Sequence, residues 1–114
     1  MKEKIGFKEF LEIESKLEIK IGRVVEVNEV PKSDKLLRLS VDFGPDDIRT
    51  VVTNIKPHLV YRGILLDKKL AFVTNLEPVK MMGIESTAMI LPGDIENSSG
   101  VPITIVGRPG VSIL

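Results

Sequence analysis

Four basic side chains and two methionines are the residues of this chain best suited to chemistry with a ligand. Lys32, Lys35 and Arg38 are close together in the sequence, and Lys80 follows much later, directly before Met81. A lysine or arginine can neutralise a phosphate, and the soft thioether of a methionine can lie against a flat base. Met89 belongs to the same group, although core filling is the alternative role for both methionines. These residue types predict a partner that carries phosphates and flat faces.

The cations are predicted to lie in two loops and at the start of a strand. Residues 31–35 (Pro-Lys-Ser-Asp-Lys) are typical of a turn, and the apolar residues that alternate from Leu37 to Phe43 indicate a half-buried strand. Two short apolar runs, residues 70–73 and 88–91, read as buried strands. The segment between these runs, which holds Lys80 and Met81, is therefore predicted to be a loop.

A second arginine lies on the strand that follows a turn at residues 44–47. If Phe43 pairs with Ile48, Asp42 lies opposite Arg49 and Arg38 lies opposite Thr53. The carboxylate would then neutralise Arg49 as a cross-strand pair. On this register Arg38 is the freer cation, and Arg49 is a weaker candidate for ligand contact.

The remaining pattern predicts a small all-β domain with additions at both ends. Residues 17–27 alternate with a period of two around Gly22, which suggests a bulge or bend. Residues 56–69 form a connector with at most a short helix, and residues 101–106 indicate one more strand. Residues 111–114 are apolar and are expected to pack inside or at a subunit interface.

A short amphipathic helix is predicted at the N-terminus, with Phe7, Phe10 and Leu11 on one side. This stripe packs either on its own domain or on a second subunit. The predicted organisation is therefore a helical segment, residues 1–14, followed by one domain, residues 15–114.

About five strands with a connector in the middle fit a five-stranded Greek-key barrel of the OB type, which binds oligonucleotides on one face and the bordering loops. In such a barrel the first and last inter-strand loops border the same face. Lys32, Lys35 and Arg38 are therefore expected to converge with Lys80, although they are distant in sequence.

Composition excludes several other classes of function. The chain has 114 residues and no cysteine, and its sixteen basic and sixteen acidic residues cancel, so nucleic acid would have to be bound by the placement of charge rather than by its excess. With a single histidine and no phosphate loop, nucleophile elbow or spaced metal pattern, we predict no catalytic residue, no metal and no cofactor. No run approaches the length of a membrane span, and the expected location is the cytoplasm.

Several blocks of the sequence, in this order, resemble the tRNA-binding domain family. They are residues 31–37 (Pro-Lys-Ser-Asp-Lys-Leu-Leu), 41–44 (Val-Asp-Phe-Gly), 49–53 (Arg-Thr-Val-Val-Thr) and 75–81 (Asn-Leu-Glu-Pro-Val-Lys-Met), followed by Gly83 and residues 86–89 (Ser-Thr-Ala-Met). The family includes stand-alone tRNA-binding proteins, the C-terminal domain or separate β subunit of methionyl-tRNA synthetases, and the endothelial monocyte-activating polypeptide. Ala88 stands where the family commonly has glycine.

The resemblance implies an OB fold, dimerisation through C-terminal and other elements outside the barrel, and binding of tRNA by shape. Methionyl-tRNA synthetase is an implied partner, for which the chain would be a non-catalytic accessory subunit. The tRNA-binding residues that it implies are Lys32, Lys35, Arg38, Asn75, Lys80, Met81, Ser86 and Met89, with Arg49 as a weaker member.

Two alternatives to tRNA binding stay open at the level of sequence. One is a dimeric chaperone that binds peptides in an apolar groove, similar to the secretion-related CsaA branch of the same fold. The other is a dimerising scaffold module without a ligand of its own.

Overall fold

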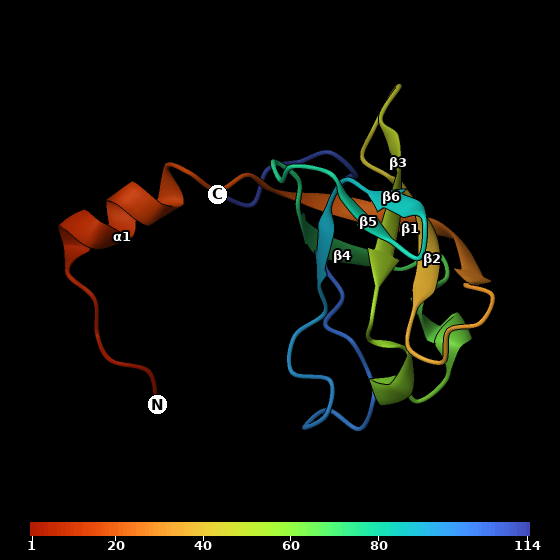
Figure 1. Ribbon diagram of the computed structural model, residues 1–114. Coiled ribbons are helices and arrows are strands. Elements are labelled where there is room, and N and C mark those ends of the chain that lie inside the picture. The colour runs from red at the N-terminus through yellow and green to blue at the C-terminus, as the bar shows by residue number, and fades with distance from the viewer.

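Five strands form one antiparallel sheet in the computed structural model, which describes all 114 residues. The strand order is β3-β2-β1-β4-β7, and a separate hairpin is formed by β5 and β6. The strands are β1 (Ile19–Glu29), β2 (Leu37–Asp42), β3 (Ile48–Thr53), β4 (Lys69–Val73), β5 (Val79–Met81), β6 (Ile84–Ser86) and β7 (Met89–Leu91). Figure 1 shows this sheet curling into a small barrel.

The sheet closes through β6 and the residues after it. The Ser86 hydroxyl accepts a hydrogen bond from the Val52 amide of β3 at 2.9 Å, and the Thr87 amide donates to the Thr50 carbonyl at 3.3 Å. The first three strands are consecutive neighbours, and β4 returns beside β1, which is the Greek-key order. The predicted five-stranded barrel of the OB type is therefore confirmed.

The barrel interior holds the hydrophobic core. Leu39 and Val41 of β2, Val51 of β3 and Leu70 of β4 are completely buried. The rings of Phe43 and Phe72 meet edge to face with their centroids 5.3 Å apart, which is a favourable aromatic geometry. This interior is a filled core, so a ligand must bind on the outside of the barrel.

The irregularity of β1 lies three residues after the glycine that the sequence singled out. Val24 pairs with Val41 and Glu26 with Ser40, so Val25 is the extra residue of a bulge. Gly22 instead lies inside the barrel, where a Cβ atom would come within 2.5 Å of Val41. The bulge changes which parity faces inward, because it inserts one residue into the alternation.

The C-terminal segment pairs with the edge of β1 that β2 leaves free at the start of the strand. The Ile21 amide donates to the Val111 carbonyl at 3.0 Å, and the Ile113 amide donates to the Ile19 carbonyl at 2.8 Å. The strand predicted at residues 101–106 is wrong: Val101, Ile103 and Ile105 donate one backbone bond each, to Ser98, Pro92 and Lys69, and these bonds do not form a strand ladder. Pro102, directly before Ile103, has no N–H to donate, which interrupts any ladder at this point.

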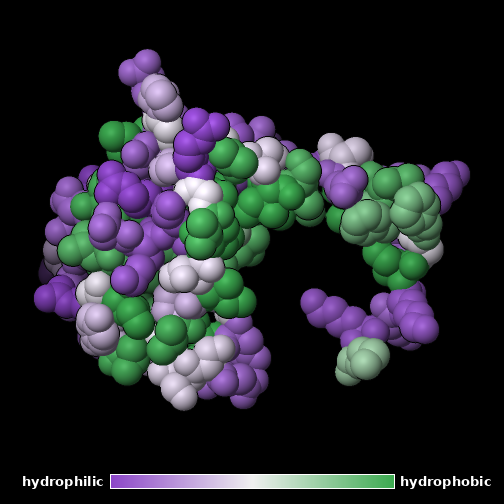
Figure 2. Space-filling view, turned by 180° about the vertical axis from the view of Figure 1, so that it is seen from behind, coloured by the Kyte–Doolittle hydropathy of each residue, from purple (hydrophilic) through white to green (hydrophobic).

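The N-terminal helix stands away from the barrel as an arm. Helix α1 (Phe7–Glu14) has no buried residue, and Phe7 is 75% exposed. Figures 1 and 2 show the helix held off the barrel by an extended linker, with apolar side chains uncovered on it. The prediction that this stripe packs on its own domain is therefore wrong.

The connector between β3 and β4 contains two short 3₁₀ helices, η1 (Lys56–His58) and η2 (Arg62–Leu65), where at most one short helix was predicted. Leu65 of η2 is completely buried and closes one end of the core. None of the helices has the length and apolarity that crossing a membrane would require.

Candidate nucleic-acid interface

The segment after β4, predicted as a loop, contains the β5–β6 hairpin. Met81 pairs with Ile84, and the two turn residues between them, Met82 and Gly83, both have positive φ, 51° and 79°. A two-residue turn of this kind matches the twist of the flanking strands. The hairpin was missed because asparagine and glycine, not methionine, are the residues that usually signal such a turn.

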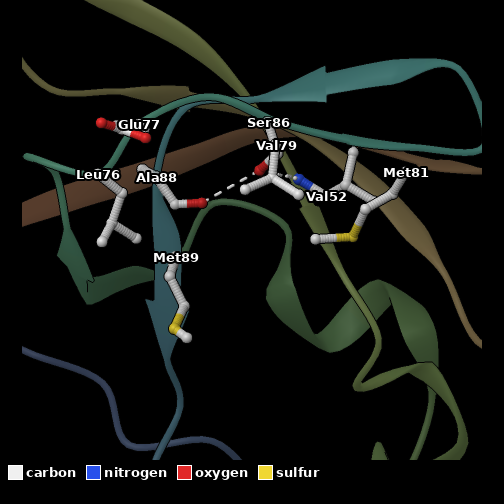
Figure 3. Close-up of a pocket in the computed structure, with 8 residues that line it drawn as sticks. All are labelled: Val52, Leu76, Glu77, Val79, Met81, Ser86, Ala88 and Met89. Carbon is white, nitrogen blue, oxygen red and sulfur yellow. Dashed lines mark hydrogen bonds between the residues drawn. The ribbon is translucent and has the colours of Figure 1, made fainter.

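An apolar pocket of about 130 Å³ lies between this hairpin, β3 and β7. We call it the methionine pocket, and its lining residues are Val52, Leu76, Glu77, Val79, Met81, Ser86, Ala88 and Met89. Figure 3 shows the side chains of Met81 and Met89 on opposite sides of it. Met89 is 50% exposed, so the alternative that it fills the core is wrong.

Ser86 and Ala88 form the inner end of the methionine pocket. The Ser86 hydroxyl accepts from Val52 and donates to the Ala88 carbonyl at 3.1 Å, and Ser86 is only 4% exposed. Ser86 therefore holds the hairpin on β3. Ala88 does not have a positive φ, so the residue that replaces the usual glycine fits here without backbone strain.

Arg38 lies beside the pocket because its cross-strand neighbour on β3 lines the pocket. The observed register places Arg38 opposite Val52, which lines the pocket, and Asp42 opposite Ile48. The predicted pairs, Arg38 with Thr53 and Asp42 with Arg49, are therefore wrong by one residue. Arg38 is exposed and belongs to no ion pair, so its charge is available to a phosphate.

Arg49 is occupied by contacts within the chain. Its guanidinium donates to the Asp47 carboxylate at 2.8 Å and to the Thr74 carbonyl at 2.8 Å, and it lies 5.3 Å from the centre of the Phe43 ring. The hydrogen bond from Arg49 lowers the pKa of Asp47 below its usual range. Arg49 thus joins the start of β3 to the end of β4, which fits a structural role.

Asn75 ties the segment after β4 to the residues before β1. Its side-chain oxygen accepts from the Glu18 amide and its nitrogen donates to the Lys16 carbonyl, both at 2.8 Å. Next to it, the Thr74 hydroxyl donates to the Glu18 carboxylate and lowers the pKa of Glu18. The amide of Asn75 therefore positions the chain that leads into the hairpin.

The lysines are exposed at two separate places. Lys32 and Lys35 lie in the loop between β1 and β2 and form no ion pair. Lys80 alternates with Val79 and Met81, which face the pocket, so it lies on the opposite face of the hairpin, across from Glu85. The structure brings Met81, Ser86 and Met89 around one pocket, places Arg38 beside it as the cross-strand partner of Val52, and leaves Lys80 outside it.

Sequence reasoning missed the apolar half of this site. Val52, Leu76 and Val79 line the pocket but are indistinguishable in sequence from ordinary strand or loop residues. The alternation around Lys80 could have indicated that Val79 and Met81 share a face. No cluster of histidine and carboxylate side chains in the chain has the arrangement that a metal would need.

Comparison with known proteins identifies the family of this chain. The family model described as "Putative tRNA binding domain" matches residues 19–108. The methionine–tRNA ligase of Methanococcus aeolicus is 45% identical over 95 residues, which are 82% of this chain and 13% of that protein. The enzyme of Porphyromonas gingivalis is 42% identical over 97 residues, 85% of this chain and 13% of the relative. The chain thus spans 13% of the length of these curated relatives.

Two solved structures share the fold. The MetRS related protein from Pyrococcus horikoshii superimposes with a TM-score of 0.77 at 30% identity, over 99% of this chain and 100% of that one. The CsaA chaperone protein from Picrophilus torridus has a TM-score of 0.77 at 24% identity, over 97% of this chain and all of that one. The second likeness shows the fold alone. On the family match, the chain belongs to the tRNA-binding domain family.

Proposed function

We propose that the chain is a non-catalytic module that binds folded tRNA by shape, on the outer face of the barrel around Arg38 and the methionine pocket. The observation that carries this proposal is the position of an unpaired, exposed arginine next to an apolar pocket with a methionine on each side. Lys32 and Lys35 extend the positive charge along the loop that precedes Arg38. This combination suits a phosphate backbone with exposed bases better than it suits a small-molecule substrate.

The electrostatic part of this binding rests on a small number of cations, because the net charge of the chain is zero. Each phosphate that is neutralised contributes a salt slope of about −0.7 to −0.9 in a double-logarithmic plot. Three or four such contacts therefore correspond to a total slope of about −2 to −4. Binding of this kind has a modest affinity, and its phosphate contacts do not depend on the nucleotide sequence.

A titration of folded tRNA at several salt concentrations tests the proposal. Affinity should fall with salt on that slope, and Arg38→Ala should reduce the slope by about one contact. Lys68→Ala is the matched charge control. Lys68 is exposed and directly precedes β4, whereas the hairpin follows β4, so this change should leave the slope unchanged. Absence of a tRNA shift even at low salt would reject the function.

We also propose that the protein acts as a homodimer in which the α1 arm covers a second copy. Phe7, Phe10 and Leu11 are exposed on α1 at spacings that place them on one helix face. Ile113 and Leu114 are exposed at the other end of the chain, which lies along β1. Apolar side chains at both ends of one chain are a surface that a partner copy would cover.

Sedimentation at micromolar concentration measures the mass of the assembly and therefore the number of chains in it. We expect the mass of two chains for the full chain and a weaker dimer after removal of residues 1–14 or in a Phe7→Ser, Phe10→Ser double variant. Lys8→Ala, on another face of the same helix, should dimerise normally. A full chain with the mass of one subunit would contradict the dimer, and an unchanged truncated dimer would remove the arm from the interface.

The role of the module in aminoacylation is also a proposal. Its relatives named methionine–tRNA ligases are much longer than this chain, which supports action either as part of a synthetase or in trans with one. Peptide binding is the second candidate, because a pocket with almost entirely apolar walls would also accept an apolar side chain. Peptide capture that is insensitive to salt, without binding of tRNA, would favour that candidate.

A further inference from the structure

The interior of the methionine pocket has almost no free hydrogen-bonding group. The Ser86 hydroxyl is already bonded to Val52 and Ala88. Glu77 is exposed, and its carboxylate lies at the edge of the pocket, on the side away from Met81 (Figure 3). Whatever enters must therefore present an apolar or flat aromatic surface and be recognised by its size rather than by hydrogen bonds.

The size of the pocket matches a single six-membered ring. Its volume is about 130 Å³, and an apolar cavity of about 150 Å³ is known to hold benzene. A second, open pocket of about 220 Å³ adjoins it and shares Val52, Met81 and Met89 in its lining. The two together leave room for the one ring of a pyrimidine or for the two rings of a purine.

Aromatic residues, the usual partners of unstacked bases, are not found at this pocket. Phe43 and Phe72 are buried in the barrel core, and Phe7 and Phe10 are on the arm. Tyr61 belongs to the connector before η2. The soft, polarisable thioethers of Met81 and Met89 are consequently the groups that would lie against a base here.

Charge next to the pocket distinguishes a nucleotide from an apolar peptide. Arg38 is the cross-strand neighbour of Val52, and neither Arg38 nor the lysines of the preceding loop has an acidic partner. A nucleotide would place its base in the pocket and its phosphate against Arg38, whereas an apolar side chain would leave these cations unused. Charge complementarity therefore favours RNA.

From these four observations we infer that the methionine pocket holds one unstacked base of the bound RNA. Met81 and Met89 contact the base, and Arg38 contacts a phosphate beside it. This inference rests on the proposed function. It specifies the place on the protein that holds a single-stranded nucleotide of the tRNA. Single-stranded positions with exposed bases are the parts of a folded RNA that a protein can read in this way.

Methyl NMR of the methionines tests the inference directly. The chain has four methionines, so labelled methyl groups give four signals, of which Met1 and Met82 are internal controls. Hexanucleotides of cytidine, uridine or adenosine should shift the signals of Met81 and Met89 through the ring current of the base. Val79→Trp, at an exposed lining residue, should abolish the shifts by filling the pocket.

The affinity of the full chain for an unmodified tRNA transcript provides the second measurement. Met81→Ala should weaken binding about tenfold, the lower part of the range for loss of a base-stacking side chain. Met82→Asn is the matched control, because asparagine tolerates the positive φ at that position. The control should bind as the wild type does.

The possible failures are distinguishable. Tight tRNA binding that is unaffected by Met81→Ala, with no shift of the Met81 and Met89 methyl signals, would overturn the base pocket and leave the proposed function standing. Absence of tRNA binding by the wild type would overturn both. Shifts caused by a soluble leucine-containing peptide but not by any hexanucleotide would overturn the inference in favour of peptide binding.

Discussion

A Lys32→Ala, Lys35→Ala, Arg38→Ala triple variant is expected to bind folded tRNA about 100-fold more weakly than the wild type at low salt, on the basis of about 1 kcal/mol for each lost contact. The physical reason is that all three side chains are exposed and form no ion pair within the chain, so their charges are available to phosphates. The double-logarithmic salt slope should also become less steep by about 2 to 3. Filter binding or gel shift at several salt concentrations measures both quantities.

The matched control removes the same charge from another part of the molecule. Lys2, Lys4 and Lys8 are exposed on or before the α1 arm and form no ion pair. A Lys2→Ala, Lys4→Ala, Lys8→Ala variant should keep most of the affinity, with a slope change well below that of the first triple variant. Equal losses in the two variants would mean that net charge, rather than the face around Arg38, attracts the RNA.

Gly22→Ala is expected to destabilise the folded barrel by about 2 to 3 kcal/mol, a typical cost of forcing extra atoms into a filled core. A Cβ atom at this position would lie 2.5 Å from Val41, 2.7 Å from Phe43 and 2.9 Å from Phe72. The rings of Phe43 and Phe72 already pack against each other, so relief requires movement of several buried side chains at once. The free energy of unfolding in urea measures the effect.

Gly6→Ala is the control for this substitution. Gly6 precedes α1 and has no neighbouring atom within 4 Å of an added Cβ, and neither glycine has a positive φ. The control should therefore change the free energy of unfolding by less than about 0.5 kcal/mol, as is usual for surface positions. If Gly22→Ala is as mild as Gly6→Ala, the barrel interior is less tightly packed around β1 than the distances indicate.

The alternation of apolar residues predicted the strands well but not how they pair. The turn after β2 is closed by a hydrogen bond from the Phe43 amide to the Asp47 carbonyl at 2.8 Å. That bond places Asp42 opposite Ile48 instead of opposite Arg49. Alternation specifies the face of each residue, whereas the hydrogen bonds of the turn specify the register. An error of one residue was enough to assign Asp42 to Arg49, when its ion pair in the structure is with Arg23.

Residue type alone identified the candidate groups of the site, but not their directions. Lys80 and Met81 are adjacent in sequence, and both were expected on one binding face. In the β5–β6 hairpin they point to opposite faces, because successive side chains of a strand alternate. The expectation of a loop removed this constraint, since a loop imposes no alternation.

By itself, the sequence determined that this chain folds as a small barrel with cations in its first loop and methionines near its last strands. These features depend on residue type and on local periodicity, both of which can be read from residues that are close together in the sequence. The tertiary structure alone decided that Val52, Met81 and Met89 enclose one pocket and that Arg38 lies beside it. The reason is that the pocket joins β3, the hairpin and β7, and the contacts that bring these distant segments together, such as Ser86 to Val52, are formed only when the barrel closes.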